Sequence, residues 1–278
     1  MMPRVRACVP PWFLILSFYR VFLYNGNDMR LLVIIPTYNE IENITRIIPE
    51  VFKHIPPDAA VLVVDDGSPD GTAAAVASMQ GEDKPFGGRL ALLERAGKQG
   101  LASAYIAGFS WGIERKFDAL CEMDADFSHK PEYLPALLDA LLSHDVAIGS
   151  RNVAGGAVEG WSRLRNLISK GGSLYARAVL GCPTKDLTGG FTMWRASALQ
   201  KIGLGSIISK GYAFQIEMKY RAHRRGLSVR EIPIVFPDRT AGVSKMSGGI
   251  FLEAVTAVFK IKAAVRKEER ERDAQEIR

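Results

Sequence analysis

Two aspartates near the middle of the chain, Asp124 and Asp126, have the spacing of a metal-binding pair. They follow an apolar stretch, and side chains two apart on an extended backbone point to the same side. Two adjacent carboxylates suit Mg²⁺ or Mn²⁺, hard cations that prefer oxygen ligands and keep some coordination positions for substrate phosphates. An isolated Asp-x-Asp pair is more often a solvated turn, so its meaning depends on the surrounding chain.

Two earlier segments show the same change from apolar strand to polar loop. Residues 31–35 and 61–64 are short apolar runs, and each is followed at once by turn residues. Such runs are typical of parallel strands that are covered on both faces, and ligands bind outside the carboxyl ends of such strands. The three transitions would bring six side chains to one rim of the sheet: Tyr38, Glu40, Asp65, Asp66, Asp124 and Asp126.

The elements that must position this rim alternate between strand and helix. We expect strands over 31–35, 61–65, 90–94, 118–123, 146–149 and 229–236. We expect helices over 41–54, 70–80, 99–115, 131–142, 210–226 and 250–262. Asp70 or Thr72 is the expected N-cap of the second helix, and residues 153–160 and 239–248 read as polar or glycine-rich loops. The alternation predicts an α/β domain with a parallel sheet.

Composition limits the classes of protein to which the chain can belong. A length of 278 residues with 47% hydrophobic residues can bury a sizeable core, and the net charge of +6 is modest. There is no basic stripe interleaved with aromatics, so nucleic acid is not an expected partner. The three cysteines are scattered and form no Cys-x-x-Cys pair, which argues against a disulfide framework or a zinc site and fits a reducing compartment.

The two ends of the chain are the least informative segments. Residues 9–24 are apolar but contain Arg20 and two prolines, so they fall short of a membrane span. Residues 1–28 can be read as an extension without a role in the fold, as a peripheral membrane anchor, or as a signal segment. Residues 266–278 are rich in both charges and read as a solvated or frayed helix. We divide the chain into an N-terminal extension (1–28), a catalytic domain (29–262) and a charged tail (263–278).

Eight ordered motifs resemble one known family. They lie at residues 35–40, 64–72, 123–129, 149–151, 165–169, 186–191, 210–218 and 238–245. In these segments the chain resembles the inverting family 2 glycosyltransferases and, among them, the polyprenol (dolichol) monophosphate mannose synthases. The resemblance covers roughly residues 30–260. It implies a GT-A-type nucleotide-diphospho-sugar transferase fold, in which helices flank a mostly parallel central sheet.

The same resemblance implies an activity and its site. The expected reaction is transfer of mannose from GDP-mannose to a polyprenyl phosphate, at the cytoplasmic face of a membrane that the protein contacts peripherally, with a membrane protein as a further expected partner. Asp124 and Asp126 are the implied metal ligands for Mg²⁺ or Mn²⁺, and Asp126, Arg151 and Arg239 the implied catalytic residues. The implied donor and acceptor contacts are Pro36, Tyr38, Glu40, Val64, Asp66, Lys98, Asp124, Ala125, Arg151, Arg165, Ser169, Arg239 and Lys245.

Three other functions fit parts of the sequence. A UDP-glucose:polyprenyl phosphate glucosyltransferase would share the metal and nucleotide motifs, but such relatives usually carry two C-terminal membrane spans. A transferase with a soluble glycan acceptor fits less well with the arginines in the loops. A non-catalytic subunit of a membrane glycosylation assembly would not need both metal aspartates. A dehydrogenase is not expected, because no Gly-x-Gly-x-x-Gly motif follows the first strand.

Overall fold

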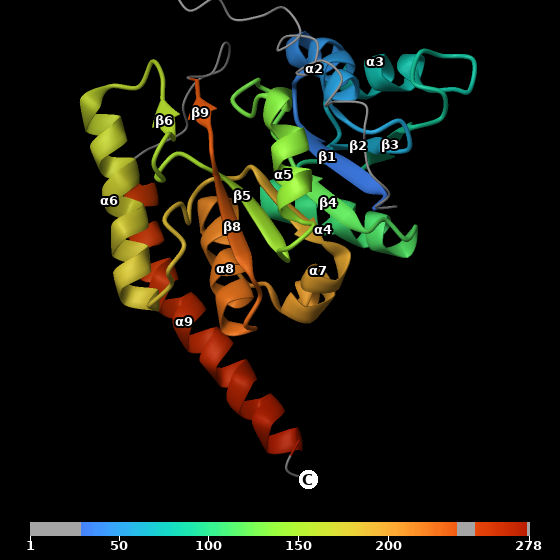
Figure 1. Ribbon diagram of the computed structural model, residues 1–278. Helices are drawn as coiled ribbons and strands as arrows, with labels where there is room; N and C mark the ends of the chain where they lie inside the picture. Colours follow the sequence, from blue (N-terminus) through green and yellow to red (C-terminus); the bar gives the residue numbers. More distant parts are fainter. Residues whose placement is uncertain (1–28, 238–247, 277–278) are drawn as a thin grey trace, which may run out of the picture.

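The computed structural model describes residues 29–237 and 248–276 of the chain. Within these residues, seven strands form a central sheet in the order β3-β2-β1-β4-β7-β5-β8 (Figure 1). The strands are β1 (Leu31–Thr37), β2 (Ala60–Asp65), β3 (Leu90–Glu94), β4 (Ala119–Glu122), β5 (Val146–Ser150), β7 (Thr192–Arg195) and β8 (Val229–Pro233). Strand β7 is antiparallel to both β4 and β5, and the other neighbours are parallel. The mostly parallel α/β architecture is confirmed.

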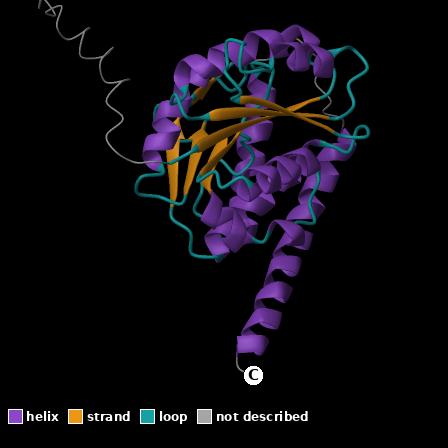
Figure 2. Ribbon diagram, turned by 90° about the vertical axis from the view of Figure 1, so that its right-hand side faces the viewer, coloured by secondary structure: helices purple, strands orange, loops and turns teal. Residues whose placement is uncertain are grey.

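Helices cover both faces of this sheet (Figure 2). The helical segments are α2 (Ile41–His54), α3 (Thr72–Met79), α4 (Leu101–Glu114), the 3₁₀ turn η1 (Pro131–Tyr133), α5 (Leu134–Ala140), α6 (Arg163–Leu180), α7 (Ala196–Ile202), the 3₁₀ turn η2 (Leu204–Ser206), α8 (Gly211–Arg224) and α9 (Gly248–Glu276). Alternate side chains of β1 point to opposite faces, as a strand requires. Leu31, Val33 and Ile35 pack with α2, α3 and α5, whereas Leu32 and Ile34 pack with α4, α7 and α8.

Helix α2 shows how the sequence specifies this packing. Its apolar residues recur at the spacing of one helical face, and Ile44, Ile47, Ile48 and Val51 are fully buried. Burial of each such side chain contributes about 1.5–3 kcal/mol relative to exposure. The helix spans the residues that the periodicity predicts.

A third core lies beside the sheet, where α6, α8 and α9 meet. Ala176, Ile216, Tyr220, Ile261 and Val265 are buried together there. Helix α9 therefore does not end near residue 262, as expected, but continues to Glu276 and extends away from the body of the molecule (Figure 1).

Basic residues in the last turn and at the C-cap of α8 hold the distal part of α9. Glu268 forms ion pairs with Arg221 and Arg225, and Glu269 pairs with Arg224 at 2.7 Å. The segment expected to be a solvated helix is helical and exposed over residues 270–275, but it is attached to its neighbour at Glu268 and Glu269. A domain boundary between residues 262 and 263 stays a prediction, and the helix crosses it without a break.

Several local predictions were wrong. Strand β7 and helix α7 were not predicted. The expected helix over 131–142 begins as the turn η1 and ends at Ala140, and the N-cap of α3 is Gly71 rather than Asp70 or Thr72. The strand expected over 229–236 ends as β8 at Pro233, which lacks a backbone N–H.

The remainder of that expected strand forms a second, small sheet. Strand β9 (Val235–Phe236) pairs with β6 (Ala157–Val158), which lies inside the loop expected over 153–160. The 153–160 segment is thus attached to the chain that leaves β8. No helix in the two described stretches is long and apolar enough to cross a membrane.

Candidate functional site

The loop after β2 is organised by Asp65, at the carboxyl end of that strand. Its carboxylate accepts hydrogen bonds from the Thr37 hydroxyl at 2.8 Å, the Ser68 hydroxyl at 2.6 Å and the Ser68 backbone N–H at 2.8 Å. Asp65 is fully buried, so these hydrogen bonds replace the contacts with water that its carboxylate would otherwise make. Its role is to shape the rim of the sheet, and it is not available to a ligand.

The same loop positions the segment that follows β1. The Ser68 hydroxyl accepts a hydrogen bond from the Asn39 N–H at 3.0 Å, and Asp70 accepts one from the Ile41 N–H at 3.1 Å. The Thr72 hydroxyl accepts one from the Glu40 N–H at 3.0 Å. Two predicted motifs, separated by about 30 residues in the sequence, therefore form one structural unit.

Side chains expected to contact the donor lie on this unit. The Lys98 ammonium lies 4.1 Å from the centre of the Tyr38 ring, so two of the residues that the resemblance implies as donor contacts meet. Pro36 pairs with Val64 in the sheet. Val64 is fully buried and Ala125 is nearly so, which places their side chains in the core rather than on the rim. A donor contact of either residue stays a prediction.

Asp66 holds the start of α4. Its carboxylate accepts the Arg95 Nε–H at 2.6 Å and the backbone N–H groups of Gln99 and Gly100 at 3.0 and 3.1 Å. A carboxylate at a helix start is favoured by the helix dipole. This geometry supports a positioning role for Asp66, and its expected contact with the nucleoside stays a prediction.

The aspartate pair follows β4 at the same rim. The Asp124 side chain is 29% exposed, whereas Asp126 is 8% exposed and accepts hydrogen bonds from the Ser128 N–H and hydroxyl. Phe127 has a φ of 61°, a left-handed conformation that costs energy for a residue with a side chain. The turn after the pair is thus tightly constrained, and Asp124 offers the more accessible carboxylate.

Two buried residues support Asp124: His129, which the sequence places beside the pair, and Tyr105, which sequence reasoning did not assign. The Tyr105 hydroxyl donates to Asp124 Oδ1 at 3.0 Å; burial, followed by the charge of Asp124, raises the pKa of Tyr105 well above its ordinary value, so this donor keeps its proton. The Asp124 backbone N–H donates to His129 Nδ1 at 2.9 Å. Burial lowers the pKa of His129, which keeps the ring neutral and able to accept that bond.

The pair meets the chemical requirements of a divalent-ion site. Asp124 and Asp126 offer hard oxygen donors only, as Mg²⁺ and Mn²⁺ prefer. Within residues 29–237 and 248–276, no group of three or more His, Cys, Asp or Glu side chains has a metal-binding arrangement. Two carboxylates would leave most coordination positions to a diphosphate and water, which is the usual pattern for Mg²⁺.

Arg151, after β5, is held by Asp186. Its Nε and Nη2 donate to the two carboxylate oxygens at 2.8 and 2.7 Å, and Nη2 also donates to the Thr188 hydroxyl at 3.0 Å. Burial would raise the pKa of Asp186, but the hydrogen bonds and charge of Arg151 outweigh it and hold that pKa at about 2. Asp186 belongs to a motif that the sequence reveals, but its bidentate partner becomes evident only in the structure.

Aromatic rings connect the aspartates to the arginines. The His129 ring stacks on Phe191 with centroids 4.8 Å apart and meets the edge of Phe236 at 5.7 Å. Phe236 in turn lies against Trp161 at 5.7 Å and 5.3 Å from the Arg151 guanidinium. The structure therefore brings the Asp124 and Arg151 regions to one site.

Arg165 also lies against Trp161. Its guanidinium is 4.1 Å from the ring centre, and its backbone N–H donates to Ser162, the N-cap of α6. Ser169 lies one turn further along the same helix face. Arg239 and Lys245 fall outside the described residues, as do the predictions for residues 1–28.

A buried polar network holds β4 through Glu122, the last residue of that strand. Glu122, which is fully buried, accepts hydrogen bonds from Trp194 Nε1 at 2.8 Å and from Gln215, and Gln215 accepts one from Lys219. Burial raises the pKa of Glu122 and lowers that of Lys219. Gln215, from the 210–218 motif, thus helps to hold the strand that carries the site. The sequence shows only that Gln215 and Lys219 are four residues apart on one helix.

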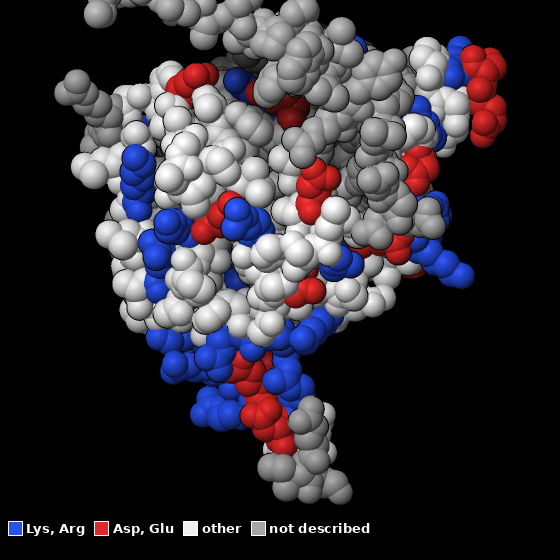
Figure 3. Space-filling model, in the orientation of Figure 1, with Lys and Arg blue, Asp and Glu red and all other residues white. Residues whose placement is uncertain are grey.

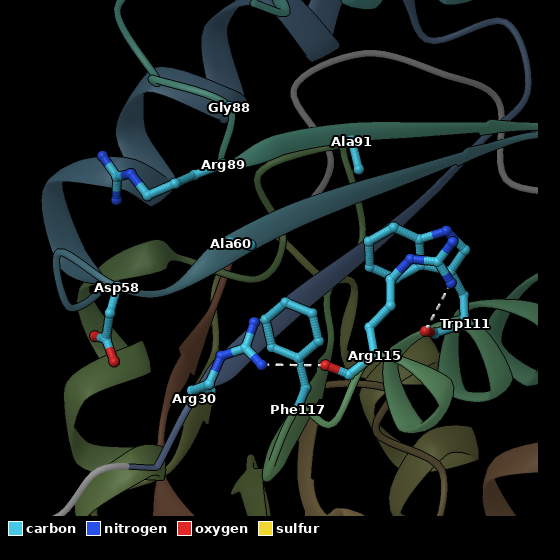
Figure 4. A pocket seen from close by; sticks show the side chains of 9 residues that line it. All are labelled: Arg30, Asp58, Ala60, Gly88, Arg89, Ala91, Trp111, Arg115 and Phe117. Carbon is cyan, nitrogen blue, oxygen red and sulfur yellow. Dashed lines mark hydrogen bonds between the residues drawn. The ribbon is translucent and has the colours of Figure 1, made fainter. Parts of the chain in front are cut away.

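A separate pocket of about 410 Å³ lies at the opposite, amino-terminal ends of β1 to β3 (Figure 4). Arg30 and Arg115 stack over Phe117 and Trp111 at its wall, at 4.6 and 4.0 Å. Ala60 contributes to its lining. Because the predicted site residues lie at the carboxyl ends of these strands, this pocket is not part of the candidate site.

The fold and rim define the class of protein, and a family model agrees. The model described as Glycosyl transferase family 2 matches residues 32–203, more than half of the chain. The chain belongs to this family and is a glycosyltransferase.

Two proteins of known name are similar to this chain over most of its length. The chain is 48% identical over 240 residues to an undecaprenyl-phosphate mannosyltransferase of Micrococcus luteus, covering 86% of this chain and 97% of the relative. It is 48% identical over 233 residues to a polyprenol monophosphomannose synthase of Mycolicibacterium smegmatis, covering 84% and 85%. The expected family resemblance is confirmed.

Solved structures establish the fold independently. A glucosyl-3-phosphoglycerate synthase of Mycobacterium tuberculosis, in complex with Mn²⁺, UDP and glucosyl-3-phosphoglycerate, superimposes with a TM-score of 0.62 at 17% identity, covering 85% of this chain and 81% of that one. A complex of the same enzyme with Mg²⁺ and UDP gives 0.62 at 16% identity, covering 85% and 80%. At this identity the likeness shows the GT-A fold alone.

Proposed function

We propose that this glycosyltransferase transfers mannose from GDP-mannose to a polyprenyl phosphate, with inversion at the anomeric carbon. The observation that carries the proposal is the 48% identity, over more than four-fifths of the chain, to two proteins named for mannosyl transfer to polyprenyl phosphates. The geometry of the rim is consistent with it, because Phe236 lies against both His129, next to the carboxylate pair, and the guanidinium of Arg151.

The donor half of the site would use the loops after β1, β2 and β4. Tyr38, Glu40 and Lys98 would contact the nucleotide, on a frame fixed by Asp65 and Asp66. Asp124 and Asp126 would hold Mg²⁺ or Mn²⁺, which neutralises the charge of the leaving diphosphate. The presence of Mn²⁺ or Mg²⁺ in the structural neighbours is consistent with this choice.

The acceptor half requires positive charge rather than a strong base. The second pKa of a phosphate monoester is about 6, so the nucleophile is largely dianionic at neutral pH. Arg151, Arg165 and Ser169 would hold it, because guanidinium groups make charge-assisted contacts with phosphate oxygens. We expect Arg239 and Lys245 to complete the group. Attack opposite the departing diphosphate inverts the anomeric carbon.

The chemistry of the acceptor implies where the enzyme would work. A polyprenyl phosphate resides in a membrane, so the protein would act at the membrane surface as a peripheral enzyme. Nucleotide sugars and a reducing compartment favour the cytoplasmic face. A membrane-protein partner would be compatible with this placement.

The decisive experiment is a transfer assay on the purified full-length chain, with Mn²⁺ or Mg²⁺ and a short polyprenyl phosphate. GDP-mannose and UDP-glucose are offered in parallel, and the product is identified by mass and by the anomeric proton in NMR. We expect polyprenyl phosphate mannose with inverted configuration. Transfer from UDP-glucose in place of GDP-mannose, or retention of configuration, would overturn the proposal.

A further inference from the structure

A basic pocket of about 360 Å³ lies between α6 and the chain that leaves β5. Four cationic side chains line it: Arg151, Lys170, Arg177 and Lys185. Arg151 belongs to the proposed reaction site, and the other three have no role there. Figure 3 shows Lys and Arg side chains along the side of the molecule on which α6 lies.

The charges of these cations are only partly balanced. Asp186 pairs with Arg151, and Glu231 accepts a hydrogen bond from the Lys185 backbone N–H at 2.8 Å. In the described part of the chain, Lys170, Arg177 and Lys185 form no side-chain ion pair, and the buried Nε of Arg177 has no hydrogen-bond partner. A donor buried without a partner is costly, and the unpaired cations of the pocket have hydrogen-bonding capacity left for an anion.

Two exposed leucines lie on α6 beside the cations of this pocket. Leu174 lines the pocket and is 64% exposed, and Leu167, two turns earlier on the same face of α6, is 69% exposed. Exposed leucines beside lysine and arginine are typical of helices that lie on a membrane surface, where the apolar side chains enter the acyl region and the cations meet the headgroups. The combination favours a lipid over a soluble anion.

We propose that this pocket binds the phosphodiester headgroup of an anionic phospholipid and so docks α6 on the membrane. Lys170, Arg177 and Lys185 contact the phosphate, and Leu167 and Leu174 enter the lipid. The inference deepens the proposed function, since it supplies the membrane contact that a polyprenyl phosphate acceptor requires, but binding is measured without any turnover.

The test is sedimentation of the full-length protein with vesicles of neutral phosphatidylcholine, with and without phosphatidylglycerol. The triple variant Lys170→Gln, Arg177→Gln, Lys185→Gln is compared with Lys53→Gln, Lys84→Gln, Lys201→Gln, which loses the same charge at exposed positions elsewhere. At about 1 kcal/mol per cation near an anionic surface, the first variant should bind the anionic vesicles about a hundredfold more weakly. The control variant should bind like the wild type.

Further arms separate the possible outcomes. The single variant Lys170→Gln, at an exposed position, tests the pocket if the triple variant does not fold. Vesicles of phosphatidylcholine with polyprenyl phosphate test the other lipid source; weakened binding to these alone would overturn the assignment to phospholipid. Equal binding by the two triple variants would show that the attraction depends on net charge alone and would overturn the proposal that this pocket binds the lipid. GDP affinity, measured on each variant, should stay unchanged. Vesicle binding does not depend on the sugar donor, so the two proposals can fail separately.

Discussion

The two members of the Asp-x-Asp pair are held differently. Asp126 is nearly buried and fixed by Ser128, whereas Asp124 is more exposed and oriented by Tyr105 and His129. Asp126 is therefore the more rigid of the two proposed metal ligands. Rigid placement matters, because a ligand that must be reoriented on binding contributes less to catalysis.

Asp126→Asn should reduce sugar transfer at least about a hundredfold, since loss of a metal ligand removes several kcal/mol of charge stabilisation and each 1.36 kcal/mol is tenfold in rate. The amide oxygen can still accept the bonds from Ser128, so the fold should persist. The assay is transfer at saturating divalent ion, with circular dichroism as the check of folding. Asp83→Asn, in an exposed turn, is the control; wild-type activity in Asp126→Asn would refute the metal-ligand assignment.

Asp186 predicts a pH dependence of stability. Its pKa is about 2 in the folded protein against an ordinary value of 3.8, so the unfolded chain binds more protons between these values. The stabilisation is complete above about pH 4 and is lost as the pH falls toward 2, by about 2 kcal/mol in total. Urea unfolding between pH 2 and 6 measures it. In Asp186→Asn this part of the acid dependence should disappear; an unchanged profile would show that the pair contributes nothing.

At this scale the sequence predicted which residues gather but not how they are held. The strand ends were enough to place Tyr38 and the aspartates on one rim, whereas the contact of Lys98 with Tyr38 is seen only in the structure. The side chains that hold the site residues could not be predicted. Tyr105 contacts Asp124, and Asp186 contacts Arg151, across 19 and 35 residues of chain. No local periodicity encodes such pairs.

Among the elements, the buried parallel strands were predictable because each is a short apolar run that ends in a turn. Strand β7 was not, because it is four residues long, includes Thr192 and Arg195, and takes its identity from its partners on both sides. The pairing of β6 with β9 was missed for the same reason: two residues form no pattern.

Helix α4 packs on the sheet through glycine. A Cβ at Gly112 would lie 2.5 Å from Leu120 Cδ2 and 2.8 Å from Leu32 Cδ2, so Gly112→Ala should destabilise the protein by about 1–3 kcal/mol through overpacking. Gly171, in α6, has no atom within 4 Å of such a Cβ. Gly171→Ala is the matched control and should be neutral or stabilising by up to about 1 kcal/mol. Chemical denaturation of both variants checks the pair; equal effects would contradict the close packing of α4.

On the scale of the whole molecule, α9 joins the proposed catalytic domain to the charged tail. Val265 is buried in the third core, and Glu268 pairs with the nearly buried Arg221. A chain that ends at residue 262 loses both, and leaves a buried charge with fewer partners.

Truncation after residue 262 should therefore lower stability by about 3 kcal/mol or more, whereas truncation after residue 270 should have little effect. Thermal unfolding of the two shortened proteins and the full chain makes the comparison. If the two truncations behave alike, the ion pairs and Val265 are dispensable, and the tail is a separate segment as the sequence suggested.

The antiparallel strand β7 also sets an order of assembly during translation. Strands β1 to β4 find their partners among one another within residues 31–122, through local strand–helix–strand units. Strand β5 has only β7 and β8 as neighbours in the described sheet, and both are synthesised later. At about 5–20 residues per second, β5 leaves the ribosome seconds before either partner exists. The first half of the sheet should thus form as a nascent unit, and the arginine-bearing half should join it only once residue 195 has emerged.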